Sequence, residues 1–282
     1  MVEASTQRGG FSPGLASRLS LADGRRVFMK AVSEAANPDS PGMHRREAKI
    51  VAALPASAPV PRLLWTFDEG GWVVLCFEDV EGRHPHQPWT DSDLDLVVGT
   101  LREMSAVLTP SPIEAGATAG DAFKGEINGW ARALARGEDR LDTWSTRHLS
   151  RLAGLEAEAP ALVEGETLLH FDTRADNLLI AGDRVYVVDW PWARTGAAWV
   201  DWLGMAPSVT MQGGPEPEEF MSRFDLRAAP KAAIDAALCS LAGYFVVHAL
   251  DPPPPGIPTV RAFQAAQGVV ATRWLRARTG WG

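Results

Sequence analysis

The chain has 282 residues, of which 46% are hydrophobic and 22% are charged, and its formal net charge at pH 7 is −8. This composition is typical of a globular protein with a sizeable core, and the negative charge argues against nucleic acid as the main partner. The acidic excess follows residue 82, where 25 Asp and Glu outnumber 18 Lys and Arg. Two interpretations stand: attraction of a cationic substrate, or a solvated acidic surface.

The first 80 residues predict a small antiparallel sheet with one helix. Residues 16–21 and 25–32 are β-compatible runs on either side of an Asp-Gly turn signal. Residues 62–67 and 72–78 flank a second turn signal that contains two glycines. Between the two hairpins, residues 43–54 have helical periodicity. The predicted order of elements is therefore β-β-α-β-β.

The rest of the chain predicts mostly helices. Residues 90–108 place their apolar side chains on one helical face after Thr90, which is a suitable N-cap. Further helices are predicted at 121–136, 140–157, 199–211, 216–224, 230–250 and 258–278, and short strands at 167–171, 177–181 and 184–190. The expected fold class is α+β, with a β-rich lobe over residues 1–80, a helical lobe over 81–282 and a cleft between them.

The apolar segment 232–250 is the one place where a membrane span has to be considered. It is rich in alanine and carries Asp235 near one end and His248 near the other. These features favour a buried core helix over a membrane span. The N-terminus also lacks a basic start followed by an apolar run, so we expect a cytoplasmic protein without a membrane partner.

A polar cluster lies among the short predicted strands, in the sequence HFDTRADN at residues 170–177. His170, Asp172 and Asn177 have the spacing H-x-D-x-x-x-x-N, and Asp189 follows twelve residues after Asn177. The predicted hairpin between Asn177 and Asp189 brings its two ends together, so Asp172, Asn177 and Asp189 should converge. Phosphoryl transfer from a nucleotide needs such a set: a carboxylate for the attacking hydroxyl and oxygen ligands for Mg²⁺.

At these residues the sequence resembles the aminoglycoside phosphotransferase (APH) family, which has a protein-kinase-like fold. HFDTRADN is similar to the catalytic loop of that family, and the run Val-Asp-Trp at 188–190 to its metal-binding segment. Lys30, and Glu47 17 residues later, resemble the strand lysine that holds nucleotide phosphates and its helix partner. Because these landmarks follow one another in order, the resemblance covers most of the chain and implies a bilobal fold.

The resemblance implies a role for each polar residue of the loop. Asp172 would be the catalytic base, and Asn177 and Asp189 would hold Mg²⁺. His170 would anchor the loop by hydrogen bonds, and Asp176 would be a solvated or turn-capping residue. For Arg174 two roles stay open: a guanidinium that stabilises transition-state charge, or a salt bridge to a loop carboxylate.

The resemblance also implies a nucleotide site for ATP or GTP. The segment FEDVEG at 77–82 is similar to a hinge whose backbone, at Glu78 and Val80, reads the adenine edge. In the segment 8–19, Gly10 and Ser12 would fold over the phosphates as hydrogen-bond donors. Asp201, twelve residues after Asp189, matches a family Asp that supports the catalytic loop.

The sequence departs from the family pattern after Asp189. Pro191 stands where the family often has Glu, and Ala197 and Ala198 stand where a Gly-Asp-Pro turn is common. There is no long segment after Asp189 that could serve as a platform for a protein substrate, so protein substrates are disfavoured.

Three functional hypotheses follow. The first is a kinase that phosphorylates a hydroxyl of a small molecule, such as an aminoglycoside-like antibiotic that is possibly cationic. The second is the same chemistry on a metabolite: choline, an amino alcohol or a sugar. The third is a silent nucleotide-binding module, against which the intact Lys30, Asp172, Asn177 and Asp189 argue. Trp192 is the tryptophan freest to face a substrate, and the sequence does not indicate an oligomeric state.

Overall fold

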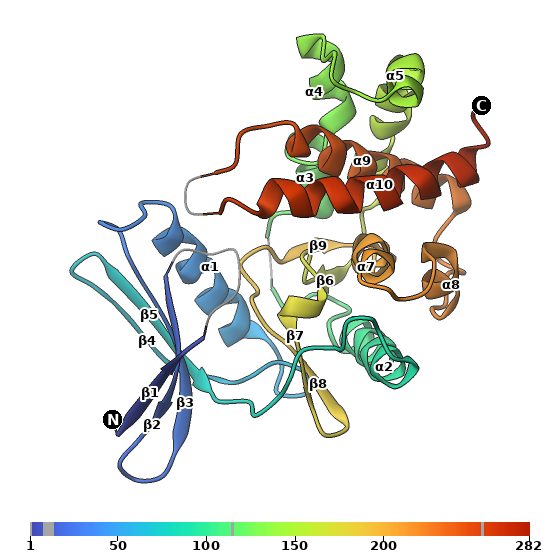
Figure 1. Cartoon of the computed structure of the whole chain (residues 1–282). Coiled ribbons are helices and arrows are strands. Elements are labelled where there is room, and N and C mark those ends of the chain that lie inside the picture. The colour runs from blue at the N-terminus through green and yellow to red at the C-terminus, as the bar shows by residue number, and fades with distance from the viewer. Residues whose placement is uncertain (1, 8–13, 114–115, 255–256) are drawn as a thin grey trace.

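The computed structural model describes residues 2–7, 14–113, 116–254 and 257–282. Its N-terminal part is an antiparallel sheet of five strands in the order β1-β2-β3-β5-β4. The strands are β1 (Glu3–Thr6), β2 (Leu15–Ser20), β3 (Arg26–Ser33), β4 (Leu63–Glu69) and β5 (Trp72–Glu78). Figure 1 shows this sheet at one end of the molecule, with most of the helices at the other.

Glycines in the left-handed region form the two hairpin turns of the sheet. Gly24, with φ of 83°, follows Asp23 between β2 and β3. Gly70 and Gly71, with φ of 61° and 77°, join β4 to β5, and positive φ at both positions suits the twist of a hairpin. Strand β1 was not predicted: the sequence pattern indicated only the other four strands of this sheet. Its side chains are exposed throughout, so only its pairing with β2 makes it a strand.

Helix α1 (Ser40–Ala53) packs on one face of the sheet, against β3, β4 and β5. It buries His44, Glu47 and Val51 on that side. The sheet contributes Val32 and Leu75 to the same apolar core. In Figure 1, α1 lies between the sheet and the rest of the molecule, so its outer face is turned toward the cleft region.

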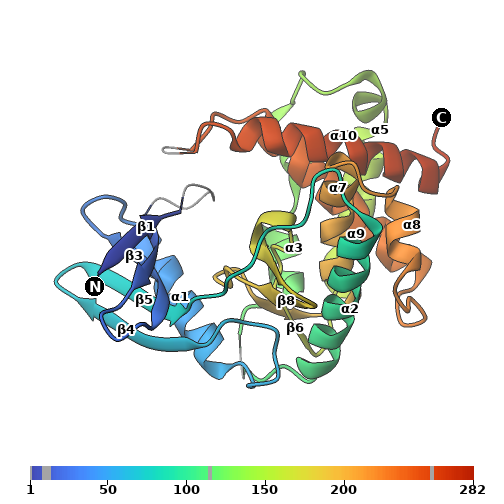
Figure 2. The same ribbon diagram turned by 60° about the horizontal axis from the view of Figure 1, so that its bottom comes forward.

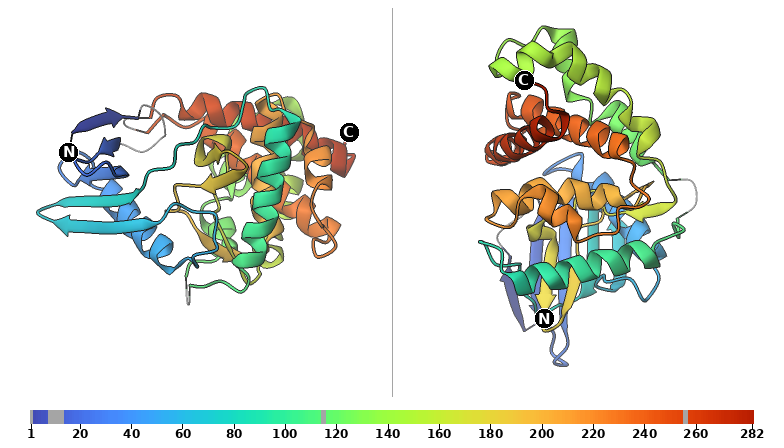
Figure 3. Two further views of the ribbon diagram at one scale, coloured as in Figure 1. Left: turned by 90° about the horizontal axis from the view of Figure 1, so that it is seen from below. Right: turned by 90° about the vertical axis from the view of Figure 1, so that its right-hand side faces the viewer.

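The segment between β5 and α2 (Asp91–Val107) joins the sheet to the helices. Figure 2 and the left panel of Figure 3 show it crossing from the sheet to the start of α2. The backbones of Arg83 and Ile180 exchange two hydrogen bonds, of 3.0 and 2.7 Å. The guanidinium of Arg83 also donates to both oxygens of the buried Asp93 carboxylate. The predicted cap of α2 is confirmed, because Thr90 Oγ1 accepts the N–H of Asp93.

The helix predicted over 121–136 is two helices in the structure, α3 (Ala119–Gly125) and α4 (Gly129–Arg136). Thr118 and Asp121 form a capping box that starts α3 earlier than the apolar pattern indicated. Residues 126–128 are not helical, and α4 begins at Gly129, which packs so closely on the backbone of Gly243 in α9 that a Cβ there would clash. The prediction of one continuous helix was therefore wrong.

The remaining helices agree with the predicted ranges to within three residues at either end. They are α5 (Thr143–Glu156), α7 (Trp199–Met211), α8 (Pro217–Ser222), α9 (Lys231–Ala249) and α10 (Val260–Thr279), with the short α6 (Ala159–Leu162) in addition. The right panel of Figure 3 shows α9 and α10 side by side, with α4 and α5 beyond them. Within the described residues, α9 is the helix long and apolar enough to cross a membrane, and 67% of its apolar window is buried in the core.

Two small antiparallel pairs lie between the sheet and these helices. β7 (Leu178–Ala181) and β8 (Arg184–Val187) form the predicted hairpin. β6 (Thr167–Leu169) pairs with β9 (Arg194–Gly196), a strand that the sequence did not predict. These pairs hold the two segments in which the polar cluster lies.

Candidate active site

The backbone of the loop after β6 is hydrogen-bonded to the side chain of Asp201, which lies on α7. The backbone N–H of His170 donates to Asp201 Oδ2 at 2.7 Å, and the N–H of Phe171 donates to Oδ1 at 2.8 Å. Phe171 has φ of 66°, a conformation that is strained for a bulky residue. Both oxygens of one buried carboxylate therefore hold this strained turn in place, directly before Asp172.

His170 is a structural residue of the same turn. Its ring is fully buried, stacks edge-on against Trp190 at 4.8 Å, and accepts the N–H of Asp172 at Nδ1 over 3.3 Å. Nε2 therefore carries the proton and donates it to the carbonyl oxygen of Val188 at 3.0 Å. Burial lowers the pKa of His170 to about 4, so the ring is neutral at neutral pH.

Asp172, Asn177 and Asp189 lie together along one cleft. Asn177 Nδ2 donates to the carbonyl oxygen of Asp172 at 2.8 Å and lies 3.3 Å from Asp172 Oδ2. The N–H of Val188 donates to the carbonyl oxygen of Asn177 at 2.9 Å, which closes the base of the β7–β8 hairpin. The next residue, Asp189, has φ of 71° and turns out of the strand into the cleft.

Lys30 connects the sheet to this loop. Its Nζ lies 2.7 and 2.9 Å from the two carboxylate oxygens of Glu47 and 2.9 Å from Asp189 Oδ1. Burial opposes the charge of Lys30, but the Glu47 and Asp189 carboxylates outweigh it and raise the pKa of the amine. The pKa of Asp189 is lowered, because Lys30 outweighs the effect of burial, so this pair is ionised.

The family model of the phosphotransferase enzyme family (APH) matches residues 9–237, which is most of the chain and includes the whole of this site. The chain belongs to this phosphotransferase family. The resemblance inferred from the sequence is therefore confirmed, and the protein is a phosphotransferase enzyme by family. A comparison with curated proteins found no match.

Solved structures share the fold of this phosphotransferase. A ligand-free thermostable mutant of aminoglycoside phosphotransferase APH(4)-Ia is 16% identical, with a TM-score of 0.64 over 99% of this chain and 95% of that one. A second mutant of that enzyme, in complex with AMP-PNP and hygromycin B, is 15% identical, with a TM-score of 0.65 over 98% and 94%. A choline/ethanolamine kinase family protein from Mesorhizobium loti is 13% identical, with a TM-score of 0.63 over 97% and 87%. The predicted bilobal α+β fold is confirmed.

Arg174 of the phosphotransferase is held by two carboxylates. Its Nε and Nη2 donate to Asp176 at 3.1 and 3.0 Å, and its Nη1 lies 3.3 Å from Asp172 Oδ1. Asp176 lies in a short helical turn, as the prediction of a solvated or turn-capping residue implied, and it also forms an ion pair with Arg174. The salt bridge that was one of two interpretations of Arg174 is present in the structure.

The side chain of Asp172 sits among charges of both signs. Burial raises the pKa of Asp172 to about 7, the Arg174 guanidinium opposes this shift, and the nearby Asp189 and Asp176 carboxylates add to it. The pKa of this carboxyl is therefore suited to accepting a proton near neutral pH.

The residues predicted to contact the adenine and the phosphates do not all lie in the polar cluster. Glu78 turns its carboxylate to Arg62, whose Nε donates to it at 2.8 Å. The carbonyl oxygen of Val80 accepts from Arg18 at 3.0 Å and from the N–H of Gly82 at 2.9 Å. Gly10 and Ser12 lie outside the described residues.

The cleft of the phosphotransferase has a volume of about 780 Å³ and extends well beyond the polar cluster. Its far wall includes Leu241, Tyr244 and Phe245 of α9 and Val260 and Phe263 of α10. These residues were not among the predicted site residues: the segment 232–250 was predicted to be a buried core helix, and 258–278 was predicted only to be helical. The signal was present as spacings of three and four residues on each helix, but only the contact of α9 with α10 shows which face is open.

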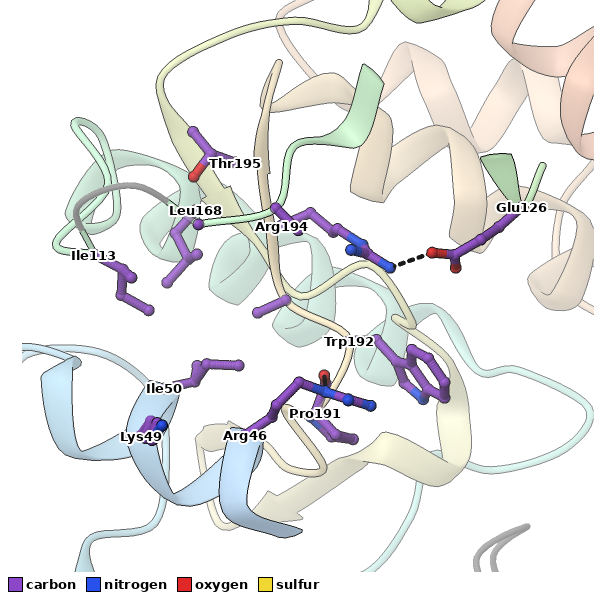
Figure 4. A pocket seen from close by; sticks show the side chains of 13 residues that line it. Arg46, Lys49, Ile50, Ile113, Glu126, Leu168, Pro191, Trp192, Arg194 and Thr195 are labelled. Carbon is purple, nitrogen blue, oxygen red and sulfur yellow. Dashed lines mark hydrogen bonds and ion pairs between the residues drawn. The ribbon is translucent and has the colours of Figure 1, made fainter. Parts of the chain in front are cut away.

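A second cavity, of about 500 Å³, lies between α1 and the segment after Asp189 (Figure 4). Arg46 Nε donates to the carbonyl oxygen of Pro191 at 3.4 Å, and its guanidinium lies 5.7 Å from the ring centroid of Trp192. At the opposite rim, Arg194 reaches Glu126 at 2.7 Å. Helix α1 is thus in direct contact with the segment that follows Asp189.

Proposed function

We propose that the protein transfers the terminal phosphate of ATP or GTP to a hydroxyl group of a small molecule. The observation that carries this proposal is that three separate segments supply the polar groups of one site: Asp172 and Asn177 of the 170–177 loop and Asp189 after β8 line one cleft, and Lys30 of β3 pairs with Asp189. Membership of the phosphotransferase family supports it, as does the AMP-PNP complex of a protein with the same fold.

In this proposal, Lys30 neutralises the nucleotide phosphates and Glu47 fixes its ammonium group. Asn177 and Asp189 hold Mg²⁺, and the residues fit that role. Asn177 uses Nδ2 for Asp172, which leaves Oδ1 for a cation, and Asp189 is ionised. Mg²⁺ favours such oxygen ligands together with phosphate oxygens and water, and it offsets the charge on the transferring group.

Asp172 accepts the proton of the attacking hydroxyl in this scheme. Its backbone is fixed by the turn that Asp201 holds, and its carboxylate lies 3.3 Å from both Asn177 Nδ2 and Arg174 Nη1. Arg174 keeps this carboxylate in place and adds positive charge beside the transferring phosphate. The hydroxyl is thereby oriented before the nucleotide reacts.

We further propose that residues 1–80 and 81–282 act as two lobes that enclose the nucleotide. The backbone of Glu78 and Val80 reads the adenine edge, and Gly10 and Ser12 cover the phosphates. The carbonyl oxygen of Val80 is occupied by Arg18 and Gly82, so its N–H is the group available to the base. Because the donor is a nucleotide, we place the protein in the cytoplasm.

The experiment that tests the proposal is ADP formation by the purified protein with Mg²⁺–ATP over a panel of hydroxylated compounds. Asp172→Ala should lower turnover by about two to four orders of magnitude, the scale of a positioned base, and leave nucleotide binding intact. Asp189→Ala should weaken Mg²⁺–nucleotide binding itself. Asp183→Ala, in the exposed turn of the same hairpin, serves as the matched control and should behave like the wild type.

Two further outcomes decide between the remaining hypotheses. Nucleotide binding without turnover on any compound would leave a silent nucleotide-binding module as the better description. If ADP forms, protection of expressing cells from a compound of the panel identifies an antibiotic substrate. Turnover of choline, an amino alcohol or a sugar without such protection identifies a metabolite kinase.

A further inference from the structure

The cleft has one wall that the phosphate chemistry does not use. It lines the same cleft as Asp172 and is built from α3, α7, α9, α10 and their flanking segments, together with Phe171 in the loop after β6 and Trp192 after β8. Its side chains are almost all apolar or aromatic: Phe123, Ile127, Phe171, Trp192, Val200, Leu241, Tyr244, Phe245, Ile257, Val260 and Phe263. The partly exposed members, which form the open surface, are Phe171, Trp192, Tyr244, Ile257, Val260 and Phe263, and the other five are buried. This apolar surface favours a ligand with an apolar body.

The carboxylates of the cleft are already engaged. Asp172 and Asp176 are paired with Arg174, Asp189 with Lys30, Asp201 with two backbone N–H groups, and Glu126 with Arg194. Among the described residues that line the cleft, this leaves the carboxylate of Asp39, which lies at the start of α1 on the opposite side. A polycationic acceptor would therefore place its ammonium groups against apolar side chains, where charge is costly.

Gln267 is a polar residue of the apolar wall; Thr173, whose buried Oγ1 has no partner among the described residues, lines the same cleft. Gln267 is only 3% exposed, it lines the cleft, and its amide makes no hydrogen bond to any described residue. The neighbouring Gln264, by contrast, is held by Arg261, which donates to its Oε1 at 2.8 Å. The amide atoms of Gln267 are not among the fully enclosed polar atoms, so the amide is open to the cleft and can donate to or accept from a bound molecule.

We propose that the acceptor is an uncharged, mainly apolar alcohol of drug-like size, which packs on this wall and hydrogen-bonds to Gln267. The proposal rests on the proposed function and names the substrate class of the same cleft. It replaces both the aminoglycoside-like antibiotic and the small cationic metabolite as the leading acceptor. The guanidinium of Arg174 already lies 5.4 Å from the ring centroid of Phe263, and this charge opposes a second cation at the aromatic wall.

Calorimetric binding to the nucleotide-free protein tests the proposal without requiring turnover. The probes are borneol and testosterone, two neutral secondary alcohols of different size, with hygromycin B as a polycation and choline as a small cation. We expect testosterone to bind more tightly than borneol, because it buries more apolar area, and both affinities to be unchanged between low and high salt. Hygromycin B and choline should bind more weakly than testosterone at both salt concentrations.

Three variants of α10 locate the contact. Gln267→Leu removes the hydrogen bond and should weaken testosterone binding about fivefold. Gln267→Glu adds a charge beside the ligand and should weaken it by about tenfold or more. Val269→Glu adds the same charge to the same helix at a position that is 69% exposed, and should bind testosterone like the wild type. Thermal unfolding of each variant shows whether it is folded. If Gln267→Glu does not fold, the testosterone affinity of Gln267→Leu alone shows whether the side chain of Gln267 contacts the ligand.

Several results would overturn the proposal. They are the absence of binding by both neutral alcohols, tighter and salt-sensitive binding of hygromycin B or choline, or unchanged testosterone affinity in Gln267→Leu. The last two leave phosphoryl transfer itself untouched. Conversely, testosterone binding that depends on Gln267, without ADP formation on any compound, would support this inference about the cleft and contradict the proposed function.

Discussion

Asp201 shows how one residue can determine a site without taking part in its chemistry. Its two carboxylate oxygens accept the N–H groups of His170 and Phe171, and Phe171 is strained at φ of 66°. The two hydrogen bonds offset the cost of this conformation, and burial raises the pKa of Asp201 to about 6 in spite of them. The position of the Asp172 carboxylate therefore depends on a neighbour on α7.

Asp201→Asn should lower kcat by about ten- to a hundredfold and change the KM for nucleotide little. The amide presents only one acceptor oxygen, so one of the two N–H groups faces an NH2 group and the turn shifts. Steady-state kinetics on the purified variant give both constants. An unchanged kcat would show that the loop does not need this carboxylate. The control is Asp235→Asn, which removes a carboxylate of α9 that pairs with Arg278 and so reports the effect of general destabilisation.

The pH dependence of kcat/KM should report the ionisation of Asp172. Burial raises its pKa to about 7, and only the ionised carboxylate can accept the hydroxyl proton. Activity should therefore fall about tenfold per pH unit below about pH 7. Arg174→Gln removes the charge that lowers this pKa and should move the inflection to higher pH. A flat profile across neutrality, or a shift to lower pH in the variant, would contradict the assignment.

At the scale of elements, helix α4 is capped by a different helix. Its N-cap residue Asn128 makes no side-chain cap bond. Instead, Glu156 at the end of α5 accepts the N–H of Trp130 at 3.1 Å and that of Ala131 at 2.8 Å. Glu156 is 3% exposed, and burial raises its pKa to about 7 against these two hydrogen bonds.

Glu156→Ala should lower the free energy of unfolding by about 1–3 kcal/mol, because two buried N–H groups lose their acceptor. Between the ordinary carboxyl pKa and about pH 7, the folded protein holds a proton that the unfolded chain has released. The contribution of Glu156 to stability therefore declines as the pH rises through this window, and the variant should lose that slope. Urea unfolding at several pH values measures both effects, with Glu158→Ala, exposed two residues later, as the control.

The elements that the sequence predicted well are those defined by local chemistry. α2 has its own cap at Thr90, and the β7–β8 hairpin has the spacing that returns Asp189 to Asn177. β1 and β9 were missed because each is a strand only through its partner, and three or four residues carry no period of their own. The polar cluster at 170–177 and 189 could be located from the sequence because it lies on and next to this hairpin.

The apolar wall of the cleft could not be predicted for the opposite reason. Tyr244 lies on α9, which is apolar on several sides, and the role of Tyr244 and Phe263 depends on how α9 meets α10. A salt bridge of Arg174 to a loop carboxylate was one of two interpretations, but which carboxylates take part left no periodic signal. Contacts between elements, which no local pattern encodes, therefore account for most of what only the structure reveals.

At the scale of the whole molecule, α1 touches every part of the site. Ser40 and Met43 line the acceptor cleft, Glu47 holds Lys30, and Arg46 contacts Pro191. The helix is a single rigid element, so a molecule in the cleft and a nucleotide at Lys30 act on the same body. The two ligands should therefore influence each other without direct contact.

We expect Mg²⁺–AMP-PNP to tighten acceptor binding about fivefold or more, and the acceptor to tighten nucleotide binding by the same factor. Glu47→Gln breaks the ion pair between α1 and Lys30 and should bring this factor close to one. Calorimetric titration of each ligand in the presence and absence of the other measures this coupling factor, with testosterone as the acceptor. Glu103→Gln, exposed on α2, should keep the wild-type factor, and a Glu47→Gln variant that also keeps it would exclude α1 as the link.

The pairing of Arg83 with Ile180 has a mechanical consequence. From Arg83 onward the connector is bonded to β7 and to Asp93, so it moves with the helices, and up to Glu78 the chain belongs to the sheet. Asp79 pairs with Arg18 and Arg26 of the sheet, and the carbonyl oxygen of Val80 accepts from Arg18, so any rocking of the sheet against the helices must pivot just after Val80. Val80, the residue proposed to bind the adenine edge, lies directly before that hinge. A nucleotide bound there would restrict the movement of the sheet, and of Lys30 with it, relative to the helices.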